Sequence, residues 1–269
     1  MRFVIIATYA IVACAPLAWL MVTSIKPLSQ TTATTATVIP WLDFTPTLAA
    51  YGDLLTGDFV RYLGSSVLIA AVSTVATVML GTACAYGFSR FPLAGAKDWL
   101  FFILSTRFMP PLAVVAPVLV MYRQFDLPNT HLGLIILYTA FNLSLAVWLM
   151  KGFLDDIPQA FEEAALVDGY TRTQAFWRVI VPQARTGMAV TAVFCLISSW
   201  NEYGFAMTLN NVHAVTVPVW FAGLQGNVQG VPWPTIAGGV LVFVAPIIVF
   251  TVLVRKHLLR GVTFGTVKG

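Results

Sequence analysis

Long apolar runs separated by short polar stretches make up most of this chain. Six of the runs are long enough to cross about 30 Å of hydrocarbon, a distance that takes roughly 20 helical residues. Because the membrane interior offers no water to backbone N–H and C=O groups, such segments are expected to be helices and not strands. The predicted spans are residues 3–25, 62–88, 98–121, 133–150, 188–209 and 234–254. The pattern therefore predicts an all-α membrane protein with six transmembrane helices, organised as a single domain over residues 1–269.

The composition excludes an ordinary soluble domain. Of the 269 residues, 58% are hydrophobic and 10% are charged, whereas soluble domains carry about 25% charged residues. The net charge of +4 is typical of the cytoplasmic loops of membrane proteins and is no sign of nucleic-acid binding. The three cysteines, Cys14, Cys84 and Cys195, lie in separate apolar runs, so neither a disulfide framework nor a zinc site is expected.

The first apolar run follows Arg2, as the apolar core of a signal peptide would. It continues to about residue 25, which is long enough to span a bilayer. No small-x-small cleavage pattern precedes a polar mature start. The run is therefore expected to be a retained first helix.

The distribution of Lys and Arg predicts the orientation of the spans. With the N-terminus inside, 11 of the 15 Lys and Arg residues fall on the inner side and 3 on the outer side, while Arg107 lies within a span. Because cytoplasmic loops carry the excess of Lys and Arg, both termini are expected in the cytoplasm. The same orientation puts residues 158–187 inside the cell and residues 26–61 and 210–233 outside.

Residues 158–187 form one polar interruption in this apolar chain. They read as two short helices separated at Gly169, which can end the first helix in a left-handed conformation. Thr171 and Gln174 have the spacing of a capping box at the start of the second helix. The charged residues of the stretch are Glu162, Glu163, Asp168, Arg172, Arg178 and Arg185. The expected product is a compact polar elbow in an internal loop.

The second helix of this elbow carries an apolar anchor. Phe176 and Ile180 are four residues apart and therefore share one helix face. Pro182 is expected to end or kink the helix before the chain enters the membrane again. From these residues alone two interpretations stay open: an amphipathic connector on the membrane surface, or a docking element for a soluble partner.

The sequence of the elbow favours the docking element, because it resembles a known motif. Glu163-Ala164-Ala165, followed by Asp168-Gly169, Phe176, Ile180 and Pro182, is similar to the EAA loop in the membrane subunits of bacterial ABC importers. In that family the loop is the coupling helix that docks into a cleft of the ATPase subunit. The resemblance implies an ATPase-coupling role for Glu162, Glu163, Ala164, Ala165, Asp168, Gly169, Phe176 and Pro182.

The resemblance extends over almost the whole chain. Trp200-Asn201-Glu202-Tyr203 resembles the signature of the carbohydrate-uptake branch, in the permease of the second maltose-permease type. Residues 258–263 and 267–269 resemble the C-terminal tail of that subunit, and residues 129–134 resemble its short outer loop. The implied substrate is a carbohydrate or a derivative, neutral or anionic: a sugar, a glycoside or a polyol.

The resemblance also implies partners and a location. They are a second homologous permease, an ATPase dimer and an extracytoplasmic solute-binding protein, around a multi-pass subunit of the bacterial inner membrane. The chain has no G-x-x-x-x-G-K-[ST] motif, so it is expected to be non-catalytic and to bind no cofactor, with ATP and Mg on the partner ATPase. In relatives the last outer loop reaches towards the sugar site, which makes Gln225, Gly226 and Asn227 candidates for contact with the binding protein.

Arg107 lies inside the third predicted span, shortly before Met109, Pro110 and Pro111. A charge within a span needs a specific reason. The two prolines are expected to break the helix there and to free backbone carbonyls. Two interpretations stay open. Arg107 lines the translocation cavity and contacts substrate hydroxyls or an anionic group, or it is a structural arginine satisfied by the freed carbonyls or by Glu202.

Other polar side chains within the spans are pathway candidates. Tyr138 and Asn142 share a face of the fourth span at i and i+4, although Asn142 could equally pair between helices. Gly81 and Ala85 form a small-residue face that favours helix packing. The pathway candidates are Arg107, Tyr138, Asn142, Trp200, Asn201, Glu202 and Tyr203.

Two other classes of protein were weighed against a permease subunit. A stand-alone secondary transporter or channel would carry an internal repeat and paired broken helices, and no repeat is visible. A membrane enzyme would need a nucleophile or a metal constellation. The chain has no G-x-S-x-G motif, and His131, His213 and His257 have no metal-binding spacing.

Overall fold

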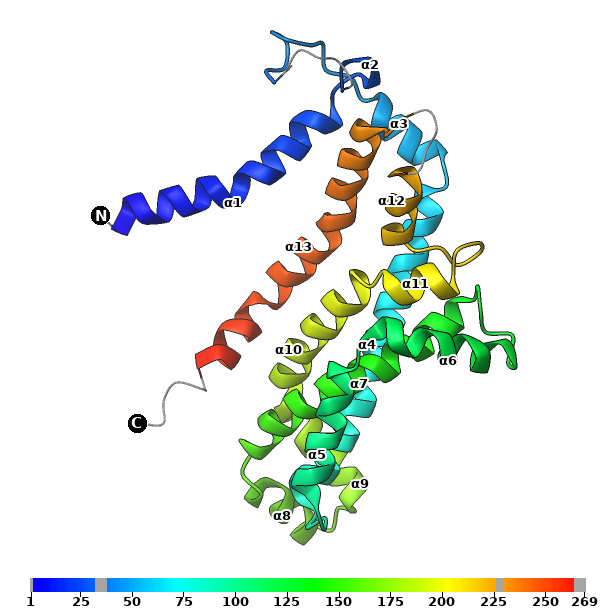
Figure 1. The fold of residues 1–269 in the computed structure, drawn as a ribbon. Coiled ribbons are helices and arrows are strands. Elements are labelled where there is room, and N and C mark those ends of the chain that lie inside the picture. Colours follow the sequence, from blue (N-terminus) through cyan, green and yellow to red (C-terminus); the bar gives the residue numbers. More distant parts are fainter. Residues whose placement is uncertain (1, 32–37, 226–229, 264–269) are drawn as a thin grey trace. The chain divides into compact units, whose positions relative to one another are not determined.

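The computed structural model describes residues 2–31, 38–225 and 230–263, and within these ranges every regular element is a helix. Five helices are long and apolar enough to cross a membrane, and a bent helix pair makes a sixth span if it is counted as one. The five long helices in Figure 1 are α1 (Arg2–Ser24), α4 (Phe59–Arg90), α7 (His131–Asp155), α10 (Val181–Trp200) and α13 (Trp233–Thr263). The all-helical class expected from the apolar runs is confirmed over the described residues.

The third predicted span, residues 98–121, is divided into two helical arms, as the prolines within it predict. It consists of α5 (Ala96–Ser105), the short 3₁₀ turn η1 (Thr106–Phe108) and α6 (Pro111–Arg123). The two arms are bent by 94°. Met109 and Pro110 have extended backbones at the bend, because a residue that precedes proline avoids the helical conformation. The expected break at the prolines is thus confirmed, and it turns the chain sharply.

The fifth span also differs from its predicted bounds of residues 188–209. A continuous helical segment runs from Arg172 to Trp200 and includes the π-helical turn η2 (Phe176–Ile180). Pro182 lies in the first turn of α10, directly after η2, and does not end the helix. A wider turn there suits a residue that has no N–H to donate. After Trp200 the helix stops, and the short helix α11 (Gly204–Leu209) follows.

The chain forms two compact units, the first made of Met1–Ser65 and Val215–Val249. Besides α1 and parts of α4 and α13, it contains α2 (Leu28–Thr31), α3 (Ala49–Thr56) and α12 (Val217–Gln225). The Tyr51 hydroxyl donates a hydrogen bond to Ser24, 2.9 Å away, which joins α3 to the end of α1. In the loop before α3, the backbone N–H groups of Ile39 and Val38 lower the pKa of Asp43 by donating to its carboxylate.

The second unit comprises Ser66–Ala214 and Phe250–Gly269 and holds the elbow. Its core is the close packing of α4 and α10 against α7. A Cβ atom on Gly81 of α4 would lie 2.7 Å from Cβ of Ala146 in α7, and one on Gly187 of α10 would lie 2.5 Å from Cγ of Phe153. Ala85 is fully buried. The small-residue face of α4 is therefore a packing surface, as the sequence predicts.

Two loops of the second unit are joined by a pair of asparagines. The side-chain carbonyl of Asn210 accepts from the backbone N–H of Asn129, and its amide donates to the carbonyl of Thr130. The side chain of Asn129 accepts in turn from the N–H groups of Asn211 and Val212. Asn129 has a positive φ of 58°, which asparagine tolerates better than most residues. These bonds hold the start of α7 beside the end of α11.

Candidate functional site

The first half of the elbow is α8 (Ala160–Val167), which ends in a Schellman motif. The N–H of Tyr170 donates to the carbonyl of Ala165, and the N–H of Gly169 donates to the carbonyl of Leu166. Gly169 has a φ of +84°, a conformation that an L side chain rarely adopts. The predicted left-handed termination at Gly169 is confirmed.

The second half begins at α9 (Arg172–Ala175), which carries the predicted capping box. The Thr171 hydroxyl accepts from the N–H of Gln174, and the Gln174 side chain accepts from the N–H of Thr171. These two bonds satisfy backbone donors that the first helical turn leaves free. Between α8 and α9 the chain therefore turns through four residues, each end of the turn being fixed by its own hydrogen bonds.

The apolar anchor of the elbow packs into the second unit. Phe176 and Ile180 are buried and, as predicted from their spacing, lie in the same cluster. The ring of Phe176 lies 4.7 Å from that of Tyr86 in α4, centroid to centroid. The remaining buried residues of the cluster are Ala85, Met150, Leu154 and Ala184, from α4, α7 and α10. The apolar anchor thus packs against residues of α4, α7 and α10.

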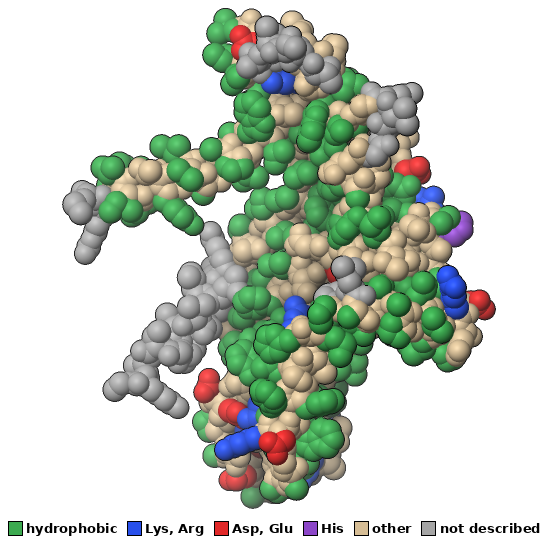
Figure 2. Space-filling model, in the orientation of Figure 1, with side chains coloured by type: hydrophobic (Ala, Val, Ile, Leu, Met, Phe, Trp, Pro, Cys, Tyr) green, Lys and Arg blue, Asp and Glu red, His purple; other side chains and the backbone are tan. Residues whose placement is uncertain are grey.

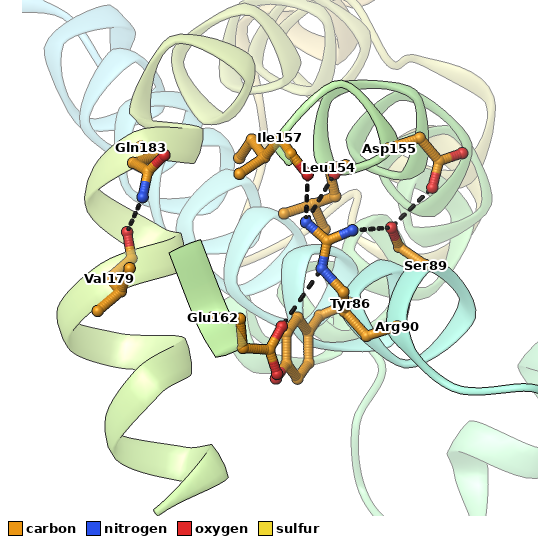
Figure 3. A network of polar contacts seen from close by, with 9 residues as sticks. All are labelled: Tyr86, Ser89, Arg90, Leu154, Asp155, Ile157, Glu162, Val179 and Gln183. Carbon is orange, nitrogen blue, oxygen red and sulfur yellow. Dashed lines mark hydrogen bonds and ion pairs between the residues drawn. The ribbon is translucent and has the colours of Figure 1, made fainter. Parts of the chain in front are cut away.

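A buried polar clamp ties α8 to the end of α4 (Figure 3). The Nε atom of Arg90 lies 3.3 Å from a carboxylate oxygen of Glu162, and their side chains are 5% and 6% exposed. The Tyr86 hydroxyl donates to the other oxygen of the same carboxylate. The Nη2 group of Arg90 donates to the carbonyls of Leu154 and Ile157, at 3.0 and 2.8 Å. One guanidinium therefore contacts α8 and the C-terminal end of α7 at once.

The coupling candidates divide between the two sides of the elbow. Glu162, Ala165 and Phe176 are buried within the second unit. Glu163, Ala164, Asp168, Gly169 and Pro182 are exposed. Figure 2 shows charged side chains gathered at the end of the molecule that α8 and α9 form. The two adjacent acids thus differ in environment, because Glu162 is buried and bonded to Arg90 and Tyr86 whereas Glu163 is exposed.

An open pocket of about 170 Å³ lies beside the clamp. Its walls come from the end of α4, from α8 and from the start of α9, and it contains both acidic and basic groups. The lining residues are Arg90, Gln159, Glu162, Glu163, Leu166 and Arg172. In the described part of the chain, no group of three or more His, Cys, Asp or Glu side chains could hold a metal ion.

A second polar network lies among the long helices and includes Arg107. The guanidinium donates to the side-chain oxygen of Asn142 at 3.0 Å, to the carbonyl of Phe141 at 3.3 Å and to the hydroxyl of Ser198 at 3.2 Å. It also lies 5.1 Å from the centre of the Phe141 ring. These partners are on α7 and α10, so Arg107 connects the bend of the third span to both helices. The accepting carbonyl is that of Phe141 on α7 and is not one of those freed by Pro110 and Pro111. Among the described residues, Glu202 is not a hydrogen-bond partner of this guanidinium.

The same network continues to α4. The amide of Asn142 donates to the hydroxyl of Ser199 at 3.0 Å, and the hydroxyl of Ser73 donates to the same oxygen at 3.3 Å. Asn142, Ser199 and Ser73 are all buried. Asn142 therefore pairs between helices, the alternative that its position in the fourth span left open.

Glu202 shapes the chain after the break in the fifth span. Its carboxylate accepts from the Tyr138 hydroxyl at 2.7 Å and from the backbone N–H groups of Phe205 and Ala206. An acidic group that accepts N–H bonds at a helix start stabilises that start. Within the Trp200–Tyr203 segment, Trp200 is thus buried and Glu202 is bonded to Tyr138. Asn201 and Tyr203 are exposed.

The binding-protein candidates fall at the edge of what the structure describes. Gln225 is the last residue of α12 and is exposed. Gly226 and Asn227 lie outside the described residues.

Sequence reasoning missed several residues that build these sites. Arg90 and Tyr86, which contact Glu162, and Ser199, which contacts Asn142, were not singled out. Neither was Ser73, which contacts Ser199. One signal was present for Arg90, since it is the basic residue in the last turn of α4. The hydroxyl residues carry no comparable signal, because serine is common on helix-packing faces.

Comparisons with known proteins agree with this arrangement. Residues 77–263 match the family described as binding-protein-dependent transport system inner membrane component. The trehalose transport system permease protein SugB of Mycobacterium tuberculosis is 35% identical over 257 residues, covering 94% of this chain and 92% of that protein. The sulfoquinovosyl glycerol transport system permease protein SmoH of Agrobacterium fabrum is 27% identical, covering 100% and 94%.

The fold has a counterpart among solved structures. A chain from the crystal structure of a bacterial ABC transporter involved in the import of the acidic polysaccharide alginate superposes with a TM-score of 0.77 at 23% identity, covering 95% of this chain and 94% of that one. The family match over residues 77–263 includes the elbow, the clamp and Arg107 with its partners on α7 and α10. This chain is therefore a member of the binding-protein-dependent transport family, a permease component of the inner membrane.

Proposed function

We propose that this permease forms half of the translocation pathway of an ATP-driven importer for a carbohydrate or a carbohydrate derivative. The observation that carries the proposal is the similarity to permeases named for sugar transport along almost the full chain. SugB is named for trehalose, and a 29% identical permease of Thermococcus litoralis, MalG, is named for trehalose and maltose. Their shared chemistry is a polyhydroxylated, uncharged cargo. The SmoH name adds a sulfonated glycoside to the candidates.

The elbow at residues 158–187 is the coupling element of this importer, in the manner of an EAA loop. Its exposed face carries Glu163, Ala164 and Asp168, and its apolar side chains Val167 and Trp177 are 88% and 51% exposed. Small residues beside exposed apolar ones suit insertion into a cleft of a partner. The opposite face is fixed by the clamp and the apolar anchor. A displacement of the elbow is thereby transmitted to the long helices, because these contacts fix the elbow to them.

This function requires that the elbow and both termini lie in the cytoplasm. The excess of Lys and Arg on that side supports this orientation. The same orientation puts the break at Trp200–Tyr203 toward the outer half of the membrane. It puts α12 in the last outer loop.

The partners are a second homologous permease, two ATPase subunits and an extracytoplasmic binding protein. ATP and Mg bind to the ATPase, since the whole sequence has no phosphate-binding loop of the Walker type. The binding protein contacts the last outer loop, where Gln225, Gly226 and Asn227 follow α12. Closure of the ATPase pair moves the elbow, and the helices then open the pathway outward and afterwards inward.

The pathway candidates contribute in different ways. Asn201 and Tyr203 are exposed and can reach a solute with their polar groups. Arg107 is half-buried, and its guanidinium is bonded to α7 and α10. Trp200 is buried. Tyr138, Asn142 and Glu202 act behind the exposed residues, because their polar groups hold helices and the α11 start in place.

Two measurements test this function. The chain is expressed with its ATPase and second permease, and the complex is purified through a tag on this chain. Separately, sugars, polyols and sulfonated glycosides are screened for a shift in the melting temperature of the partner binding protein. The expected result is co-purification with the ATPase and ATP-dependent uptake of the sugar found in the screen. A chain that never co-purifies with an ATPase, and that transports without ATP, would disprove the proposal.

A further inference from the structure

Helix α4 has no covalent connection to the elbow near the point where they meet. The elbow follows α7 after residues 156 and 157, and its second half runs through η2 into α10 without a break in the backbone. Arg90, by contrast, precedes Glu162 by 72 positions in the sequence. Whether α4 moves with the elbow therefore depends on side-chain contacts alone.

Most of the polar contacts among them are made by one guanidinium. Arg90 pairs with Glu162 on α8 and donates to the carbonyls of Leu154 and Ile157 at the end of α7. Its Nη1 group also donates to Ser89 at 3.2 Å, and Ser89 donates to Asp155 at 2.7 Å (Figure 3). A planar fork of five donors can serve these acceptors at the same time, whereas an ammonium group acts as a single point charge.

Tyr86 adds a second link one helical turn earlier on α4. Its hydroxyl donates to the carboxylate of Glu162, and its ring packs against Phe176 of η2. Glu162 is thus held by two residues of α4, four positions apart, both of which reach the same face. Because Glu162 is held at two points along α4, both rotation and translation of α8 relative to α4 are resisted.

We propose that Arg90, with Tyr86 and Glu162, is a positioning residue for energy coupling, and that the clamp makes α4 move with the elbow as one body. Nothing in this role requires Arg90 to touch the cargo, ATP or the partner ATPase. Arg90 acts through Glu162 and through the end of α7. The proposal rests on the proposed coupling function of the elbow, and it adds α4 to the two helices that the elbow moves through the backbone.

The test measures the distance between α4 and the elbow in the assembled transporter. Nitroxide labels are placed at Leu80→Cys on α4 and Thr173→Cys on α9, two exposed positions outside the clamp. The native cysteines are first replaced, and the full complex with its ATPase is reconstituted in nanodiscs. Pulsed EPR distances are recorded without nucleotide and with ATP, Mg and vanadate. Native cysteines to be replaced are Cys14, Cys84 and Cys195.

With the clamp intact, the distance is expected to stay constant between the two nucleotide states. Arg90→Lys keeps the charge but loses the fork, and the distance is then expected to shift and its distribution to broaden when ATP binds. Tyr86→Phe removes one hydrogen bond with little change in volume, and a smaller shift in the same direction is expected. This milder variant decides the question if Arg90→Lys does not assemble.

A matched control separates this role from the general loss of an ion pair. Lys151 and Asp155 form a partly exposed pair on α7 close to the clamp, and Lys151→Gln is expected to leave the distance constant. A nucleotide-dependent distance in the unmodified clamp, or a constant distance in both Arg90→Lys and Tyr86→Phe, would overturn the proposal. A chain that fails to assemble with any ATPase contradicts the coupling function itself, so the two failures are distinguishable.

Discussion

Arg90 and Glu162 form an ion pair in which the guanidinium Nε lies 3.3 Å from the carboxylate, at the junction of α4 and α8. Both side chains are almost completely buried. A buried charge that loses its partner keeps the cost of desolvation and loses the attraction that offset it. The pair therefore makes the position of the elbow sensitive to single substitutions at either residue.

Replacing Arg90 by Ala is expected to lower the free energy of unfolding of the second unit by about 3–5 kcal/mol, the usual cost of breaking a buried pair. Glu162 would be left with Tyr86 alone, and two carbonyls at the end of α7 would each lose Arg90 as a hydrogen-bond donor. Thermal unfolding of the purified complex measures the change. Lys151→Gln, in the more exposed pair, should change stability by only about 0–1 kcal/mol. Equal effects of the two variants would show that the clamp is no stronger than a surface pair.

Gly169→Pro is expected to uncouple ATP hydrolysis from transport while the membrane helices stay folded. Proline fixes φ near −65°, whereas Gly169 has a φ of +84°, so α8 can no longer end in its Schellman motif. Proline also removes the N–H that bonds Leu166. ATP hydrolysis and sugar uptake are measured together in proteoliposomes. Gly169→Asn is the control, because asparagine tolerates this conformation; transport at the normal rate in Gly169→Pro would contradict the role of the elbow.

Gly187→Val is expected to destabilise the packing of α10 on α7. A Cβ atom there would lie 2.5 Å from Cγ of Phe153, so Phe153 or the helix must move. Overpacking of this kind typically costs about 1–3 kcal/mol, and occasionally more. Gly152→Ala is a matched control on α7, because its Cβ would meet nothing within 4 Å, and it should be neutral or slightly stabilising. The melting temperatures of the two variants in detergent give the comparison.

Arg107→Gln tests both interpretations of the arginine at the bend of the third span. Loss of the guanidinium removes one hydrogen-bond donor each from Asn142, Phe141 and Ser198, and the expected cost is about 1–3 kcal/mol of stability. If Arg107 also contacts an anionic cargo, uptake of a sulfonated glycoside falls further than uptake of a neutral sugar. Arg123→Gln, at the exposed end of α6, is the control. Unchanged uptake of a neutral sugar, with no anionic substrate found, argues against an anion site.

The elbow was largely predictable from the sequence because its signals are local. Gly169 and the Thr171–Gln174 box act through hydrogen bonds over a few residues, and such bonds follow directly from residue type and spacing. The break after Met109 was predictable for the same reason, since proline restricts the residue before it. The angle of 94° at that break was not. That angle depends on the tertiary contacts that α5 and α6 make.

The sequence did not predict which side chains of the elbow are buried and which are exposed. Glu162 and Glu163 are adjacent acids in the first turn of α8 and have the same chemistry, yet one is buried against Arg90 and the other is exposed. Helical geometry separates them by about 100° around the axis. The packing surface below then determines which one turns inward.

The sequence by itself determined the apolar spans, the caps and the place of the polar elbow, because helix formation in an apolar solvent depends on local composition. Only the tertiary structure decided that Arg90 meets Glu162 and that Asn142 joins Arg107 to Ser199. Those contacts join residues far apart in the chain. They exist because α4, α7 and α10 approach closely at Gly81 and Gly187, and such an approach is a property of all three helices together.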